Sequence, residues 1–296
     1  MSGGSANRFA VSLGGHYEYL ESQKMQNSEN DGDQKPKEFV EALAKGLAII
    51  ESFDADHGEM TLSEVSRRVG LSPAAARRSL LTMKHLGYVG QREKRFHLRP
   101  RVMSLGSAFY FSARIDEVLQ PELRNLVSTF GDASSVGTLQ GMDVLYIAHY
   151  SENRSRRPSA VVGARYPAYA TSLGRILLAA LPAEELEIYL ANLKPVALTH
   201  QTLTDIDELR TTIREAGEKG FTTTVDQLDY GITALAVPIR SSGGQTIAAL
   251  NISGYSGMLT AEGLVKDRLE HLRAASAGIS SAISRFPMVS SIIATR

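Results

Sequence analysis

The sequence predicts an α+β fold in two parts, a small helical part followed by a larger part in which strands and helices alternate. Three observations lead to this prediction. At about 150 residues per domain, a chain of 296 residues suggests two domains. Two short, capped helices lie close together between residues 61 and 86. Beyond residue 130, apolar runs of strand length are interleaved with helical patterns.

Composition narrows the class of protein. The chain is 43% hydrophobic and 22% charged, which is enough to bury a sizeable core. It holds no run of eighteen apolar residues, so we expect no membrane partner. Residues 1–20 lack the order of a secretory signal, and we expect a cytoplasmic protein. The absence of cysteine excludes disulfides, thiolate zinc sites and a cysteine nucleophile, and we expect no metal and no cofactor.

The first helical segment follows a polar arm. Residues 1–35 are rich in Ser, Gly, Asn and Gln without a sustained apolar period, so we expect a disordered arm. Pro36 suits the first turn of a helix. From there to Phe53, apolar residues recur at steps of three and four, which predicts an amphipathic helix.

The next two helices are marked by their caps. Thr61-Leu-Ser-Glu64 is a capping box, and Gly70 ends the helix that it begins. Ser72 then caps a third helix over Pro73–Leu86, and Gly87 ends that helix. Two helices separated by a three-residue turn are typical of a helix-turn-helix, whose second helix enters the major groove of DNA.

A β-wing is expected after the third helix. Two short apolar segments flank a charged tip at 91–95, which predicts a basic hairpin lying along the phosphate backbone. We therefore assign residues 36–99 to a winged helix-turn-helix. On the third helix, Leu80, Leu81 and Leu86 are expected to face inward. The alternative is a small helical core domain with a solvated basic surface.

Positive charge is concentrated between residues 61 and 101. Residues 61–101 hold ten Lys and Arg but two Glu, while the whole chain is neutral. A compact basic segment indicates a polyanion partner, here double-stranded operator DNA. The alanines at 74–76 leave room for close approach to bases, and the arginines that follow supply contacts. The expected DNA-binding residues are Ser72, Ala74, Ala75, Arg77, Arg78, Lys84, Arg92, Lys94 and Arg95.

A linker helix is expected over residues 100–114. Its segment from Pro100 to Phe111 carries more apolar surface than a tether needs, at Val102, Leu105, Phe109 and Tyr110. We therefore expect it to pack in a homodimer interface that holds two DNA-reading units at half-site spacing.

Residues 115–288 are assigned to one further domain, followed by a tail at 289–296. Thr171 or Ser172 is expected to cap a helix that ends at Leu181. The other helices are expected at 115–130, from 182, at 205–219 and at 261–285. The strands are expected at 136–139, 144–150, 159–162, 221–225, 232–240 and 246–253.

The chain resembles the IclR family of bacterial transcriptional regulators along residues 37–288. The resemblance rests on the order and spacing of several motifs. These are Leu47-Ala-Ile-Ile50, Thr61-Leu-Ser-Glu-Val-Ser-Arg-Arg-Val-Gly-Leu-Ser-Pro73, Leu86-Gly-Tyr-Val89, Leu105-Gly106, Tyr166-Pro-Ala-Tyr-Ala-Thr-Ser-Leu-Gly-Arg-Ile-Leu-Leu-Ala179, Gly231-Ile-Thr-Ala-Leu-Ala-Val-Pro238 and Asn251-Ile-Ser-Gly254.

The resemblance implies a GAF-like effector-binding domain and a homodimer that assembles further into a dimer of dimers on DNA. The segment 167–175 is similar to the branch that senses protocatechuate, 4-hydroxybenzoate or β-ketoadipate. It thus implies a small carboxylate effector and control of genes for aromatic-acid catabolism or uptake.

The family's effector site is carried over residue by residue. The resemblance places the effector carboxylate on the amides of Ser172 and Leu173, where unpaired N–H groups at a helix start favour an anion. It expects an acidic group near Asp226, but the acidic stretch is one residue short, so Thr224 is the alternative. The remaining expected effector-binding residues are Leu145, Ile147, Tyr169, Ala234, Asn251 and Ser253.

Two further classes of function stay open. Ser172, His149 or His200, and Asp226 are the ingredients of a hydrolase triad, but no Gly-x-Ser-x-Gly elbow surrounds any serine, so no catalytic residue is expected. The other alternative is an adaptor whose winged helix binds protein. Arg175, which follows Ser172 on the same expected helix, could be a solvated helix residue without a role in binding. DNA binding that weakens steeply with salt would separate a regulator from both alternatives.

Overall fold

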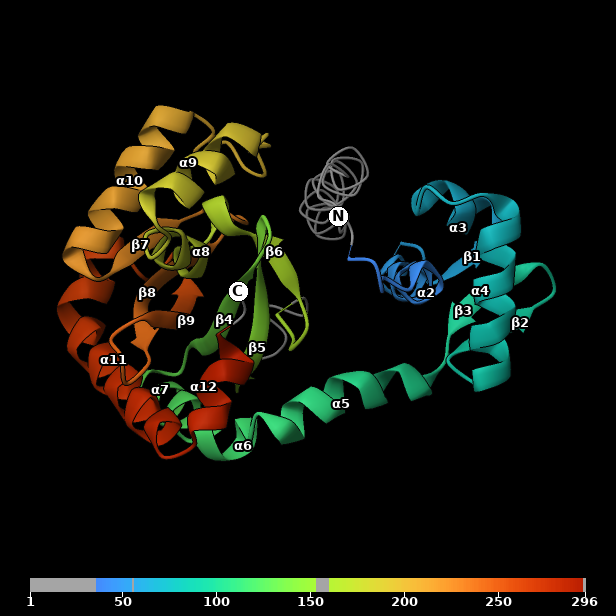
Figure 1. Cartoon of the computed structure of the whole chain (residues 1–296). Coiled ribbons are helices and arrows are strands. Elements are labelled where there is room, and N and C mark those ends of the chain that lie inside the picture. The colour runs from blue at the N-terminus through green and yellow to red at the C-terminus, as the bar shows by residue number, and fades with distance from the viewer. Residues whose placement is uncertain (1–35, 55, 153–159, 295–296) are drawn as a thin grey trace, which may run out of the picture. The chain divides into compact units, whose positions relative to one another are not determined.

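The computed structural model describes residues 36–54, 56–152 and 160–294 (Figure 1). Two compact units are present, and the boundary between them falls between Phe109 and Tyr110. The arm expected at 1–35 lies outside the described residues. No helix in the described part of the chain is long and apolar enough to cross a membrane.

Ahead of the linker, the described part of the smaller unit combines helices with a small sheet. Its helices are α2 (Glu41–Glu51), α3 (Leu62–Arg68) and α4 (Pro73–Leu86). Its strands, in the order β1-β3-β2, are β1 (Glu59–Thr61), β2 (Val89–Arg92) and β3 (Arg95–Leu98). The core holds Ile49, Met60, Val65, Leu80, Met83, Val89 and Phe96. The predicted winged helix-turn-helix is confirmed, with β1 as an unexpected third strand.

The predicted caps form the helix starts. The Thr61 amide donates to the Glu64 carboxylate at 2.6 Å, and the Glu64 amide donates to the Thr61 hydroxyl at 3.3 Å. The Ser72 hydroxyl accepts from the Ala75 amide at 3.3 Å, and Gly87 ends α4 in the left-handed conformation, with φ at 82°. Each such N-cap stabilises its helix by about 1 kcal/mol.

The predicted inner face of α4 is wrong in part. Leu80 is fully buried, but Leu81 is 40% exposed and Leu86 is 46% exposed. Because consecutive helical residues are rotated by about 100°, Leu81 cannot share the face of Leu80. Ala76, expected on the open surface of the first turn, is instead fully buried in the core.

An ion pair joins the helix-turn-helix to the end of α2. Arg68 donates to the Asp54 carboxylate, which also accepts from His57 Nδ1 at 2.8 Å. Burial raises the pKa of Asp54, but the bond from His57 and the charge of Arg68 outweigh it and lower that pKa below its usual value. Arg68, one of the ten cations in the basic segment, therefore serves to hold α3 against the end of α2.

The linker is a short 3₁₀ turn, η1 (Pro100–Val102), followed by helix α5 (Met103–Ser112). No residue of α5 is buried. Met103 and Phe111 are 76% and 74% exposed. The helix thus presents apolar surface to solvent, as its sequence predicts.

The larger unit is built on one antiparallel sheet in the order β6-β5-β4-β9-β8-β7. Its strands are β4 (Ala133–Gln140), β5 (Asp143–Ser151), β6 (Arg165–Pro167), β7 (Thr222–Val225), β8 (Ile232–Arg240) and β9 (Thr246–Tyr255). This mixture of sheet and helices confirms the predicted α+β class.

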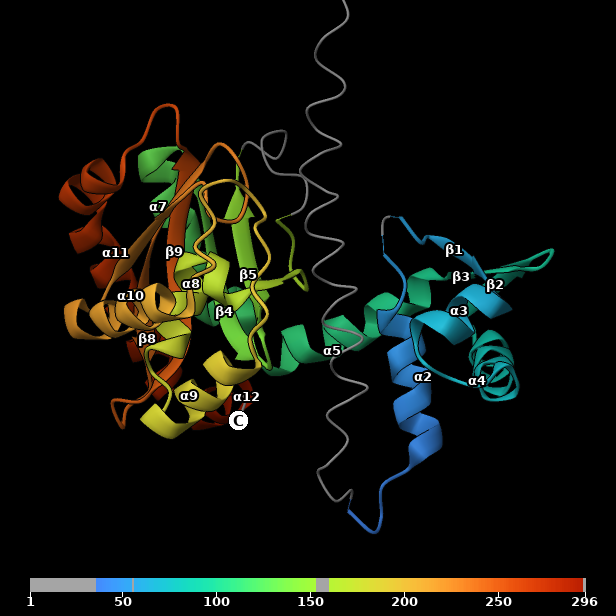
Figure 2. The same cartoon turned by 90° about the horizontal axis from the view of Figure 1, so that it is seen from above.

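Helices cover both faces of this sheet, as the two views in Figures 1 and 2 show. On one face lie α7 (Gln120–Phe130) and α11 (Ala261–Ser284). On the other face lie α8 (Ser172–Leu178) and α10 (Ile206–Lys219), with α9 (Ala183–Asn192) between them in sequence. The sheet and α8 together hold the site described below.

Several predicted boundaries differ from the structure. The helix expected at 115–130 is split into α6 (Ile115–Val118) and α7, because Pro121 begins a new helix. No strand forms at 160–164, and β6 pairs with β5 instead. Helix α8 ends at Leu178, and α12 (Pro287–Ile293) occupies most of the segment expected to be a tail.

Candidate functional site

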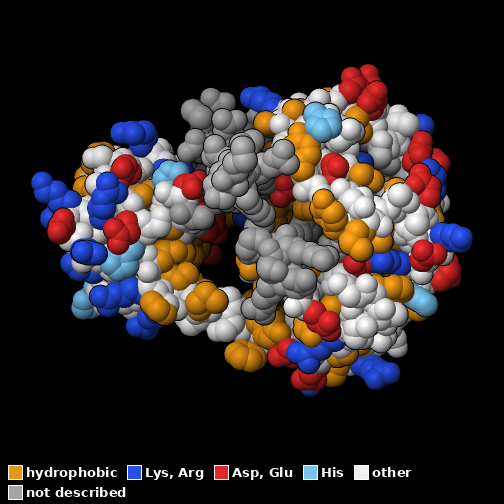
Figure 3. Space-filling model, turned by 180° about the vertical axis from the view of Figure 1, so that it is seen from behind, with side chains coloured by type: hydrophobic (Ala, Val, Ile, Leu, Met, Phe, Trp, Pro, Cys, Tyr) orange, Lys and Arg blue, Asp and Glu red, His pale blue; other side chains and the backbone are white. Residues whose placement is uncertain are grey.

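The start of α4 presents the residues expected to meet DNA. Arg77 and Arg78 are exposed on successive positions of its second turn, and Ser72 and Ala74 are exposed at its start. Ala75 is half-buried. Figure 3 shows Lys and Arg side chains gathered on this unit. The arrangement allows the first two turns of α4 to approach a groove closely.

The wing is tighter than the sequence predicts. A two-residue turn, Glu93-Lys94, joins β2 to β3, with Glu93 in the left-handed region at a φ of 53°. Arg92 and Arg95 therefore lie directly opposite each other in the strands. Like charges in that position destabilise a hairpin, so the pair is better suited to a bound polyanion than to the isolated fold.

The basic side chains differ in how far they are already engaged. Lys84 donates to the Gln91 side chain at 2.9 Å, and Arg95 donates to the Glu59 carbonyl at 3.2 Å. Four of the expected DNA-binding cations, Arg77, Arg78, Arg92 and Lys94, are exposed and form no ion pair within the described ranges, which leaves them well placed to bind phosphate.

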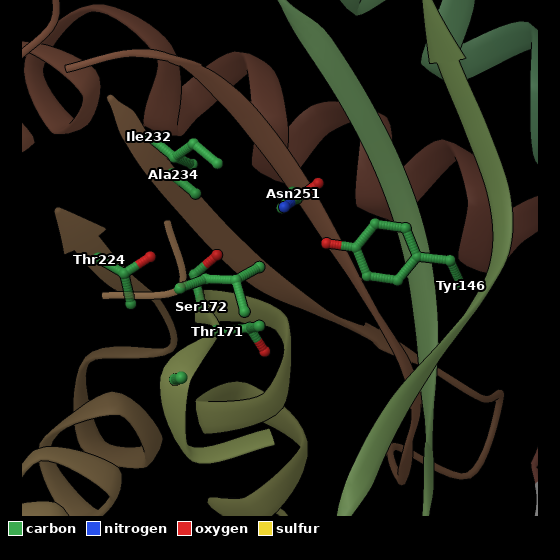
Figure 4. A pocket seen from close by; sticks show the side chains of 9 residues that line it. Tyr146, Thr171, Ser172, Thr224, Ile232, Ala234 and Asn251 are labelled. Carbon is green, nitrogen blue, oxygen red and sulfur yellow. The ribbon is translucent and has the colours of Figure 1, made fainter. Parts of the chain in front are cut away.

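A small pocket that is partly open to solvent lies in the larger unit between the start of α8 and the sheet (Figure 4). Strands β5, β7, β8 and β9 and the loop after β7 complete its walls. The lining residues are Tyr146, Ala170, Thr171, Ser172, Thr224, Leu228, Ile232, Ala234 and Asn251. Five of these nine residues carry hydroxyl or amide groups and the other four are apolar, a mixture that can orient a small polar molecule.

Ser172 brings an unpaired hydroxyl into this pocket. The N-cap of α8 is Thr171, whose hydroxyl accepts from the Gly174 amide at 2.9 Å, so Ser172 is the first helical residue. Ser172 is 1% exposed, and its Oγ has no hydrogen-bond partner in the described structure. A buried hydroxyl without a partner costs about 1–3 kcal/mol, and a ligand group can remove that cost.

Asn251 faces Ser172 from the sheet. Its side-chain oxygen accepts from the Ser135 amide at 3.0 Å, and its backbone carbonyl accepts from the Ser134 hydroxyl at 2.7 Å. These bonds fix the side chain so that its NH₂ group is directed toward the pocket. In Figure 4, the Ser172, Asn251 and Tyr146 side chains point into the same space.

Four of the predicted effector residues line the pocket, namely Ser172, Thr224, Ala234 and Asn251. Leu145 and Ile147 do not, and Tyr146 between them does. Neighbouring residues in a strand point to opposite faces, so the two predicted residues lie one position out of phase with the pocket. A register shift between Val136 and Gly137 of the paired strand accompanies this segment.

Tyr169, Leu173 and Ser253 also lie outside the lining. The Tyr169 hydroxyl donates to the Val196 carbonyl at 2.8 Å and accepts from the Val196 amide at 2.9 Å, and burial raises its pKa to about 12. Leu173 is fully buried in the core. Ser253 lies two residues beyond Asn251 on β9, opposite Ala234.

Asp226 organises a loop. Its carboxylate accepts from the Gly231 amide at 2.8 Å, the Ile232 amide at 3.1 Å and the Ser256 hydroxyl at 2.9 Å. Its own φ is 50°, a region that Asp tolerates better than most residues. The carboxylate therefore closes the turn between β7 and β8, and of the two alternatives predicted here Thr224 is the one that lines the pocket.

Sequence reasoning missed five of the lining residues. Tyr146 lies one position out of phase with the predicted residues, and Ala170 and Thr171 come directly before Ser172, where the prediction placed only the helix cap. Leu228 lies within the turn that Asp226 closes and Ile232 at its end, and no local pattern in the sequence places that turn beside the pocket.

The ingredients of a hydrolase triad are not assembled. His149 Nδ1 lies 2.9 Å from the Ser135 hydroxyl, and His200 Nδ1 lies 2.9 Å from the Tyr230 hydroxyl. In the described residues, neither histidine forms a hydrogen bond with Ser172. The same described residues contain no group of three or more His, Asp or Glu side chains placed to hold a metal ion.

An exposed basic helix-turn-helix in one unit and a small, partly polar pocket in another define a DNA-binding regulator with a ligand-binding domain. Comparison with known families agrees at both ends of the chain. Residues 42–93 match the IclR helix-turn-helix domain, and residues 109–281 match the bacterial transcriptional regulator IclR C-terminal domain. The chain belongs to the IclR family of bacterial transcriptional regulators.

Individual relatives narrow the comparison. The chain is 36% identical to the Pca regulon regulatory protein of Pseudomonas putida, over 81% of this chain and 82% of the relative. It is 30% identical to the p-hydroxybenzoate hydroxylase transcriptional activator of Acinetobacter baylyi, over 87% and 95%. An IclR homolog from Microbacterium hydrocarbonoxydans, solved in complex with 4-hydroxybenzoate, is 27% identical with a TM-score of 0.68, over 82% and 99%.

The unpaired hydroxyl of Ser172 yields a prediction about stability. Ser172→Ala should leave the free energy of unfolding unchanged or raise it by up to about 1 kcal/mol, because it removes a buried group without a partner. Ser276→Ala is the matched control, since the Ser276 hydroxyl donates to the Pro238 carbonyl at 2.6 Å and its loss should cost about 1 kcal/mol. Urea unfolding of the ligand-free protein measures both. Equal destabilisation by the two changes would contradict the assignment of an unpaired Ser172.

Proposed function

We propose that this regulator binds operator DNA through the winged helix-turn-helix and that a small carboxylate in the larger unit's pocket modulates this binding. The observation that carries the proposal is the buried Ser172 hydroxyl without a partner, facing the Asn251 amide across the pocket. The effector is an aromatic acid such as 4-hydroxybenzoate or protocatechuate, or else β-ketoadipate. The regulated genes serve aromatic-acid catabolism or uptake, and the protein acts in the cytoplasm.

The relatives support this chemistry. Two of them are regulators of the pca genes and of p-hydroxybenzoate hydroxylase, and a structural neighbour holds 4-hydroxybenzoate. None of these is named as an enzyme. A coupling of about 1–3 kcal/mol between the effector and DNA sites would change operator affinity by about 5- to 150-fold.

In the proposed complex, the carboxylate lies at the Ser172 end of the pocket. The Ser172 hydroxyl donates to it, and the amides of Ser172 and Leu173, which have no carbonyl partner within α8, are the further donors expected from the sequence. The ring packs against Ile232 and Ala234, and the distal polar group reaches Asn251.

Calorimetric titration with 4-hydroxybenzoate, protocatechuate and β-ketoadipate tests the pocket. Ser172→Ala should weaken binding of the effector by about 10- to 100-fold, because a hydrogen bond to a charged group contributes about 1.5–3 kcal/mol. Ser276→Ala should leave the affinity unchanged. An unchanged affinity in Ser172→Ala would show that the carboxylate binds elsewhere.

The DNA-binding role predicts distinct effects of two sets of residues. Arg77→Ala with Arg78→Ala should abolish preference for the operator, because these side chains are proposed to enter the major groove on α4. Lys94→Ala should weaken binding to all sequences and reduce the slope of log affinity against log salt by about 1. Lys219→Ala, which changes an exposed lysine of the larger unit, is the control. Fluorescence anisotropy over a salt series measures these effects, and an unaltered operator preference in the double variant would contradict the proposal.

We further propose that the protein is a homodimer and that two dimers associate on DNA. Apolar side chains on α2 and α5 are exposed in the single chain, including Leu43, Leu47, Met103, Leu105 and Phe111. Sedimentation velocity at micromolar concentration should therefore give a dimer, and Leu105→Glu with Phe111→Glu should shift it toward monomer. A monomeric unaltered protein would contradict this assembly.

A further inference from the structure

Arg175 is a buried cation whose partners are neutral. The residue is 4% exposed, so it is not the solvated helix residue that its sequence context allowed. Its Nε donates to the Tyr169 carbonyl at 3.0 Å, and its Nη2 donates to the Gln227 side-chain oxygen at 2.7 Å. Among the residues that the structure describes, no carboxylate forms an ion pair with Arg175.

The bonds of Arg175 place its guanidinium directly behind the pocket wall. Tyr169 is followed by Ala170, and Gln227 is followed by Leu228, and both following residues line the pocket. Ser172 lies one helical turn before Arg175. The side chain therefore folds back from α8 toward the end of the pocket that holds the unpaired Ser172 hydroxyl, without itself entering the lining.

A neutral side chain could make the same two hydrogen bonds at lower cost. Burying a charge is unfavourable unless an opposite charge compensates it, and burial lowers the pKa of Arg175 to about 10. The group stays protonated at neutral pH. A buried positive charge beside an otherwise uncharged pocket is best explained by an anion that arrives with the ligand.

We propose that Arg175 makes this pocket selective for anions: from behind the wall its charge favours a carboxylate over an equally shaped neutral group at the Ser172 end. This inference rests on the proposed aromatic-acid effector and adds the residue that sets the charge of the ligand. Arg175 is a specificity-determining residue that does not touch the effector. For a carboxylate bound about 6–8 Å from the guanidinium, an effective dielectric constant of about 20 gives a preference for the anion of about 30- to 100-fold.

A purely structural role is the competing explanation. Gln227 also accepts from the Leu203 amide at 2.9 Å and donates to the Gln201 carbonyl, so Arg175 helps to hold the loop that carries Leu228. Loss of that support would weaken every ligand, charged or neutral. Gln227→Met separates the two roles, because it removes the shared acceptor and keeps the Arg175 charge.

The test compares 4-hydroxybenzoate with 4-hydroxybenzamide, which have nearly the same shape and differ in charge. Dissociation constants are measured by calorimetry for the unaltered protein, Arg175→Met, Arg175→Gln, Arg175→Lys and Gln227→Met. Circular dichroism and thermal melting establish that each variant is folded. Arg175→Gln retains hydrogen-bonding capacity and serves if Arg175→Met does not fold.

The unaltered protein should prefer the acid, and both neutral replacements of Arg175 should reduce the ratio of acid to amide affinity by about 30- to 100-fold with little change for the amide. Arg175→Lys should keep most of the preference, and Gln227→Met should change both affinities by the same factor. Parallel losses for acid and amide in Arg175→Gln would overturn the proposal and leave the aromatic pocket standing. Binding of neither compound by the unaltered protein would refute the proposed function and the selectivity argument together.

Discussion

The site in the larger unit depends on how α8 begins. A tight turn over Ala168–Ala170 runs into the helix, and a side chain at Gly174 would collide with the Ala168 backbone, so a glycine is required there. The Thr171 hydroxyl accepts from the Gly174 amide, and Arg175 reaches back to the Tyr169 carbonyl. Together, these three contacts hold the turn against the first turn of α8. Because Thr171 does the capping, the hydroxyl of Ser172 is left to face the pocket.

The smaller unit follows a different principle. Its core and its caps fix α3 and α4, and the side chains that could bind DNA take little part in that fixing. Arg68, a cation of the same segment outside that set, does take part, since Asp54 and the end of α2 hold it. The separation means that most cations of α4 and the wing can change without damage to the core.

Local signals made most of the fold predictable. The capping box at Thr61, the cap at Ser72 and the stop at Gly87 each depend on a few neighbouring residues, and all appear as expected. The pocket was predicted less well, because its walls come from segments far apart in sequence. The phase of β5 at Tyr146 depends on an irregularity in its pairing with β4, and the burial of Arg175 depends on a loop some fifty residues away. No pattern within either segment contains that information.

Helix α5 has ten residues and no buried side chain of its own. Isolated helices shorter than about 12–15 residues are marginal in water. The helix between the winged helix-turn-helix and the larger unit therefore has little intrinsic rigidity. Its order must come from the surface that covers its apolar side chains. Hydrogen exchange at its amides would then report assembly more directly than it reports the folding of either unit. We therefore expect α5 to be well ordered only when another surface packs against it.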